Sequence, residues 1–137
     1  MTTATIHTLT IPDFLPQNLN RLLRTHWAKR NRAIKADANL VAIYAHQAGI
    51  PKARGKRRLA LVFTTNANIA PDADNLLKAM LDALVRCRLL VDDSPRWVEL
   101  AGISVNRADR RETQITLEDV VSEIPKSAIV ACWNNLK

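Results

Sequence analysis

The sequence predicts a single α+β domain, and three observations support that prediction. Segments with the character of strands and segments with helical spacing follow one another in the order strand, helix, strand, helix, strand, strand. At 137 residues the chain has the length of one domain with a sizeable core. Its hydrophobic content of 47%, with 3 Gly, is ordinary for a globular protein. We therefore treat residues 1–137 as one domain.

The first expected strand covers residues 5–11, TIHTLTI, a run rich in Thr and Ile that ends at Pro12. We interpret His7 as a strand residue that faces solvent, because a lone histidine is weak support for a ligand site.

Residues 16–27 follow with the sequence PQNLNRLLRTHW. Polar side chains here, among them Asn20, Arg21 and Arg24, are candidates for contact with a phosphate backbone. The other interpretation is a capped turn that buries Trp27. The sequence leaves both open.

The first expected helix covers residues 28–48 and is stopped by Gly49 and Pro51. Apolar residues at helical spacing give it one buried side: Ile34, Ala38, Val41, Ala45 and Ala48. The opposite side carries the cations Lys29, Arg32 and Lys35. A charged face of this kind is commonly only solvated, but with a polyanion as partner it becomes a candidate binding face.

A basic connector, KARGKRR at residues 52–58, follows this helix. We expect it to be exposed and flexible, and suited to sequence-independent phosphate contact that weakens with salt. Its candidate DNA-binding residues are Lys52, Arg54, Lys56, Arg57 and Arg58. The second expected strand, LALVFTT at residues 59–65, is apolar enough to be buried and leads through a polar loop into an acidic segment.

The second expected helix begins near Asn75 and ends within residues 86–88. The apolar residues that recur at helical spacing are Leu77, Met80, Leu81 and Leu84. Asp74 directly precedes this run and is a favoured N-cap, because its carboxylate accepts from the first free backbone N–H groups. Lys78 and Asp82 follow at steps of four residues, so they share one polar edge with Asp74.

Beyond that helix an apolar run leads to Asp92 and Asp93, and then to a Ser-Pro turn signal. Two further strands are expected at residues 97–107 and 113–119, joined by a polar turn. The segment at residues 127–136 is either a short helix or a strand.

Five of the chain's thirteen acids fall within residues 72–93, although the formal net charge is +7. Converging carboxylates repel each other unless a cation lies between them, and hard oxygen ligands suit Mg²⁺ or Mn²⁺. By spacing alone, however, Asp74 is first of all an N-cap, and the Asp92–Asp93 pair is an ordinary loop. Lys78 is then a solvated lysine beside a helix aspartate. Acid-x-acid pairs also occur in glycosyltransferases and aspartyl phosphatases, so the spacing alone only hints at a metal site.

Taken together, these residues resemble the RusA family of Holliday-junction resolvases. That family carries the pattern D-x-D-N-L-x-K-A-x-x-D-A-L, followed by an apolar run and an Asp-Asp pair. This chain reads DADNLLKAMLDAL from residue 72 and LLVDD up to residue 93. The ending DDSPRWVEL is similar to the version in phage and prophage members.

The resemblance implies that Asp72, Asp74 and Asp93 are the metal-binding and catalytic carboxylates and that Lys78 is the essential lysine. It further implies a small mixed β-sheet packed with helices, assembled as a homodimer, with Mg²⁺ or Mn²⁺ as cofactor. The implied substrate is a four-way DNA junction. Because such a junction has two-fold-related strands, each subunit would cut one of them.

The distribution of charge agrees with a polyanion partner. Between residues 21 and 58 there are eleven Lys or Arg and one acid, Asp37. A membrane surface is not expected, because no lipid-anchor motif or amphipathic Trp/Phe face accompanies the charge. With no signal peptide and no apolar run of about twenty residues, we expect a cytoplasmic protein of a bacterial host, with prophage origin suggested by the resemblance.

Two other function classes stay open. One is a junction- or DNA-binding protein without activity, which predicts DNA binding and no metal-dependent cleavage. The other is a different Mg²⁺ enzyme, such as a phosphohydrolase or a nucleotidyl-sugar transferase, which predicts a nucleotide-sized pocket and little salt-dependent affinity for DNA. The basic stretch argues against the second.

Overall fold

The computed structural model describes residues 5–16, 27–69 and 71–120. In this part of the chain the elements are β1 (Ile6–Pro12), α2 (Trp27–Gln47), β2 (Arg57–Thr65), α3 (Ala73–Arg86), β3 (Val98–Arg107) and β4 (Glu112–Asp119). This order confirms the predicted α+β class and a single small domain. The candidate residues Asn20, Arg21 and Arg24, and the segment at residues 127–136, lie outside the described residues.

The four strands form one mixed sheet in the order β1-β4-β2-β3. Strand β4 is antiparallel to both β1 and β2, whereas β2 and β3 are parallel. Parallel strands cannot be joined by a tight turn, so the connection from β2 to β3 passes through helix α3. The mixed sheet agrees with the architecture that the family resemblance implies.

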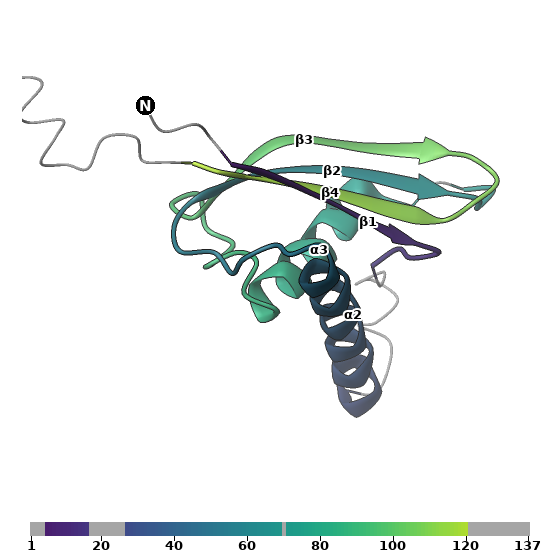
Figure 1. Ribbon diagram of the computed structural model, residues 1–137. Coiled ribbons are helices and arrows are strands. Elements are labelled where there is room, and N and C mark those ends of the chain that lie inside the picture. Colours follow the sequence, from purple (N-terminus) through teal and green to yellow (C-terminus); the bar gives the residue numbers. More distant parts are fainter. Residues whose placement is uncertain (1–4, 17–26, 70, 121–137) are drawn as a thin grey trace, which may run out of the picture.

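Both helices cover the same face of the sheet (Figure 1). The alternation of side chains along a strand explains which residues face them. In β2, Leu59, Leu61 and Phe63 are buried, while the residues between Leu59 and Phe63 are half-buried on the other face. Ile115 and Leu117 of β4 are likewise buried on the helix-covered face. The sheet therefore supplies one apolar layer of the core.

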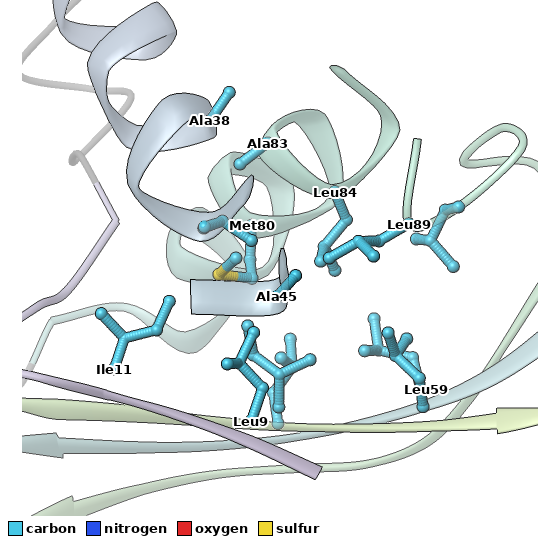
Figure 2. Close-up of a cluster of buried hydrophobic side chains, with 14 of the residues drawn as sticks. Leu9, Ile11, Ala38, Ala45, Leu59, Met80, Ala83, Leu84 and Leu89 are labelled. Atoms are coloured by element: carbon cyan, nitrogen blue, oxygen red, sulfur yellow. The ribbon is translucent and has the colours of Figure 1, made fainter. Parts of the chain in front are cut away.

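The helices supply the second layer. Figure 2 shows Met80 and Leu84 of α3 together with Ala45 of α2 above the sheet residues Leu9 and Leu59. Met80 and Leu84 are fully buried. Burying one such side chain contributes about 1.5–3 kcal/mol to folding, so this layer holds α3 against α2 and the sheet. That packing fixes where the acidic segment at the start of α3 lies.

Helix α2 is buried only in its second half, at Ala38, Val41 and Ala45. Its first turns extend away from the sheet (Figure 1). The predicted stripe is therefore confirmed in part, because Ile34 is half-buried and Ala48 is exposed beyond the helix. The helix ends at Gln47, and Gly49 two residues later has a φ of +72°, the left-handed conformation that favours glycine after a helix. The interpretation that buries Trp27 is wrong, since 62% of that residue is exposed at the projecting end.

Candidate metal and nucleic-acid site

The acidic segment opens helix α3, and its cap differs from the prediction. Asp72 is the N-cap, with extended backbone angles, and its carboxylate accepts from the backbone N of Asp74 at 3.0 Å and from Asn75 Nδ2 at 3.4 Å. The prediction that Asp74 caps the helix from Asn75 onward is wrong by two residues. Asp74 lies instead in the first turn, where a negative charge is favourable beside the helix N-terminus.

Lys78 follows Asp74 by one helical turn and is exposed, as are Asp72 and Asp74. The sequence offered a helix aspartate as its simplest partner. In the described chain, however, Lys78 forms no salt bridge, and Asp82 is instead paired with Arg86 at 2.7 Å between Oδ2 and Nε. The ammonium of Lys78 is therefore available to a ligand at the edge of α3 that also carries Asp74.

Asp93 lies in the loop between α3 and β3 and is exposed. It lines a pocket of about 430 Å³ together with two helix residues, Leu77 and Leu81. The other lining residues are Lys56, Leu59, Pro95, Val98, Glu99 and Leu100. Leu77 is one turn along from Asp74, so the pocket connects the Asp93 loop to the middle of the helix whose start carries the other acids.

Within the described residues, no group of three or more His, Cys, Asp or Glu side chains is arranged to hold a metal ion. The structure places Asp72 and Asp74 together at the start of α3, and Asp93 on the loop that follows the helix. Carboxylate oxygens are the ligands that Mg²⁺ prefers, and protein sites for Mg²⁺ commonly use one or two carboxylates plus waters and substrate phosphates. The donor chemistry of Asp72 and Asp74 fits such a site.

The basic connector differs most from expectation at Arg57. This residue begins β2 and is only 1% exposed. Its Nε donates to Asp119 Oδ1 at 2.7 Å, Nη1 to the carbonyl of Leu89 at 2.9 Å, and Nη2 to the carbonyl of Pro51 at 2.9 Å. The expectation that Arg57 is exposed in a connector is wrong, because strand alternation turns its side chain to the same face as Leu59.

Arg58 lies on the opposite face of β2. Its guanidinium spans three strands, with Nε 3.1 Å from Glu99 Oε2 in β3 and Nη1 3.0 Å from Glu118 Oε2 in β4. The hydrogen bond to Glu118, followed by that to Glu99, raises the pKa of Arg58. Arg58 is therefore part of the sheet and already occupied by two carboxylates, and does not belong to an exposed connector.

Two residues to which the sequence assigned no role complete the cluster around Arg57. His7 is half-buried, and its Nε2 lies 3.3 Å from Asp119 Oδ2, so the expectation that it faces solvent is wrong. Desolvation acts to raise the pKa of Asp119, but hydrogen bonding and charge from Arg57, with a smaller effect of His7, hold that pKa below its ordinary value. The alternation of the strand could have indicated this cluster, because Arg57, Leu59 and Leu61 are two residues apart and so face the same side of β2.

The remaining connector cations line a second pocket, of about 450 Å³. Lys52 and Arg54 are exposed and Lys56 is half-buried. The other lining residues are Pro51, Gly55, Arg57, Asp119 and Val120. The backbone of the connector is hydrogen-bonded to other parts of the chain. Ala53 N donates to the carbonyl of Arg88 at 2.9 Å, and the carbonyl of Lys56 accepts from Val120 N at 3.0 Å.

On α2, the predicted cations Lys29, Arg32 and Lys35 are exposed, as expected of a charged outer side. They lie on the projecting half of the helix, where no residue before Ala38 is buried. Arg30, which is not among the predicted cations, is half-buried on the same part of the helix.

No protein-family model matches the chain, and no curated protein matches it. Separately, no helix in the described part of the chain is both long enough and apolar enough to cross a membrane.

Proposed function

We propose that this chain is a Mg²⁺-dependent endodeoxyribonuclease that resolves four-way DNA junctions by paired symmetric nicks, and so serves DNA recombination and repair. The observation that carries the proposal is the exposed edge of α3. There Asp74 and Lys78 stand one turn apart, beside the N-cap Asp72, in the sequence pattern that resembles the RusA resolvases. In the described chain neither Asp74 nor Lys78 forms a salt bridge, so both are available to a metal and a phosphate.

Asp72, Asp74 and Asp93 would hold the cation. When bound, a divalent cation supplies the Lewis-acid chemistry of phosphodiester hydrolysis, namely charge neutralisation and activation of water. Lys78 would place a positive charge beside the phosphate, where charge increases in the transition state. The remaining task of the protein is to hold the strand in position, and the net charge of +7 supports a polyanionic substrate.

The proposal includes assembly as a homodimer and a location in the bacterial cytoplasm, where junction DNA is found. A two-fold dimer suits a junction because two symmetry-related active sites meet two symmetry-related strands. Paired nicks at these positions leave two duplexes that can be ligated.

One observation favours a second candidate, a DNA-binding protein without nuclease activity. Asp72 has a structural role as the cap of α3, and the described residues do not gather three acids into one site. If the acids serve only the helix, DNA binding remains and cleavage is absent.

The deciding experiment compares two aspartate variants in a junction-cleavage assay with Mg²⁺. Asp74→Asn should abolish cleavage and leave junction binding intact, because it removes a metal ligand and no cation that contacts phosphate. Asp109→Asn is the matched control: it removes the same charge from an exposed turn and should cut normally. Equal activity of Asp74→Asn and Asp109→Asn would exclude Asp74 from the metal site.

A further inference from the structure

The second pocket is formed by the connector and the end of β4, and its wall is rich in basic side chains. Lys52, Arg54 and Lys56 line it, and none of these three forms a salt bridge with a described residue. Positive side chains held together without partners repel one another, so an anion that binds between them is stabilised.

Asp119 is the one acid that lines this pocket, and its charge does not cancel the three cations. Its Oδ1 is bound by the buried guanidinium of Arg57 and its Oδ2 faces His7. Arg57 and Asp119 are therefore a neutral pair in the pocket wall. The wall is also rigidly held, because the other guanidinium nitrogens of Arg57 bind the carbonyls of Leu89 and Pro51. The pocket keeps a net positive charge on a fixed frame.

Lys56 connects this basic pocket to the candidate catalytic region. It lines both the basic pocket and the apolar pocket that contains Asp93. Its carbonyl is held by Val120 N, and the next residue, Arg57, donates its backbone N to the carbonyl of Trp97. A chain of phosphates that passes Asp93 can therefore continue across Lys56 to Lys52 and Arg54.

From this arrangement we infer that the basic pocket binds a backbone phosphate of the DNA strand that passes Asp93, on the far side of Lys56 from the scissile phosphate. The inference rests on the proposed DNA substrate. It assigns Lys52, Arg54 and Lys56 to one phosphate-binding site, which anchors the strand while the acids at α3 act on it.

The test is the salt dependence of junction binding, measured by fluorescence anisotropy in EDTA so that no cleavage occurs. Each lost phosphate contact should make the negative slope of log K against log salt shallower by about 0.9. Because the inference assigns one phosphate to this pocket, Lys52→Ala/Arg54→Ala should make the slope shallower by that amount, ~0.9. The control Arg110→Ala/Arg111→Ala removes two exposed cations beyond the other end of β4 and should leave the slope unchanged. Equal slopes for the two double variants would overturn the inference.

A second arm identifies the phosphate. Neutral methylphosphonate groups are placed at single positions along the cut strand, and the affinity of each junction is measured. One position near the cut should weaken binding to the unaltered protein and have no further effect on Lys52→Ala/Arg54→Ala. The DNA assignment would be contradicted if no methylphosphonate position had this effect while the unaltered protein bound inorganic pyrophosphate and the double variant did not. That result would show a site for free phosphate.

These outcomes separate the inference from the proposed function. If the slope falls as expected but Asp74→Asn still cuts, the pocket stands and the metal site fails. If Asp74→Asn is inactive but the slopes are equal, the nuclease stands and the pocket is only structural.

Discussion

Replacing Arg57 with leucine removes a guanidinium that joins three separate segments of the chain. Its partners are Asp119 at the end of β4, Leu89 after α3, and Pro51 in the connector. Leucine keeps an apolar side chain against the core and removes the polar end of arginine. The variant therefore removes all of these polar contacts together with some buried volume.

The magnitude follows from the three contacts. Hydrogen bonds from a charged donor contribute about 1.5–3 kcal/mol each, and the carbonyls of Leu89 and Pro51 each lose one. The Asp119 side chain is 36% exposed, so water can replace its lost partner and we count that contact as small. Removing a desolvated cation offsets part of the loss. We expect Arg57→Leu to lower the free energy of unfolding by about 2–4 kcal/mol, a large share of the 5–15 kcal/mol usual for a domain.

The assay is urea unfolding followed by circular dichroism, with free energies from linear extrapolation. The matched control is Arg58→Leu, the same change at the next residue on the opposite face of β2. Its two carboxylate partners lie where water reaches them, so it should cost much less. A loss for Arg57→Leu no greater than that for Arg58→Leu would refute the reasoning, and would restore Arg57 as a candidate for the DNA surface.

Three further predictions concern the site and its pH dependence. Lys78→Ala should lower the cleavage rate on the order of a hundredfold with little change in junction affinity, as expected for a group that stabilises the transition state. Single-turnover kinetics measures the rate and fluorescence anisotropy measures the affinity, and an unchanged rate would remove Lys78 from the mechanism. Chelation of Mg²⁺ should abolish cleavage and spare binding, and cutting that persists in EDTA would exclude metal dependence. Because the pKa of Asp119 is lowered in the folded state, its contribution to stability is present above its ordinary value of 3.8 and is lost as the pH falls through the lowered pKa. The stability difference between the unaltered protein and Asp119→Asn should therefore shrink at acid pH in urea titrations, and a constant difference would contradict the ion pair.

Much of the fold could be predicted because its elements carry local patterns. The spacing of Leu77, Met80, Leu81 and Leu84 identified α3, and the apolar run at residues 59–65 identified most of β2. The pairing of strands was less accessible, since the β1–β4 contact joins residues a hundred or more positions apart. No local window contains that contact.

The errors at Arg57 and His7 share one physical cause, which is tertiary contact that overrides a local pattern. Arg57 belongs to a run of basic residues, yet it lies two residues before Leu59 in β2. Its side chain therefore points to the same, buried face of the sheet. His7 was misjudged because its partner, Asp119, is supplied by a strand at the other end of the described chain. The predicted N-cap of α3 was Asp74, whereas the structure has Asp72. Both acids satisfy the same capping preference, and the backbone angles decide between them.

The candidate site was predicted only as a set of residue types. The sequence placed Asp74 and Lys78 on one helix edge, and that edge is exposed. The pocket that links Asp93 to α3, and the basic pocket that shares Lys56 with it, depend on loops packed between strands and helix. Loop positions of this kind arise from long-range packing, so neither pocket could be inferred from spacing.

The central claim is junction resolution, and the most direct measurement is a nuclease assay on a synthetic four-way junction with Mg²⁺. Linear duplex and single strands of the same sequence are the comparison substrates. Paired nicks at symmetric positions are expected in the junction alone. Tight binding of the junction without any cut, in either Mg²⁺ or Mn²⁺, would contradict that claim and make this chain a DNA-binding protein whose acids serve the start of α3.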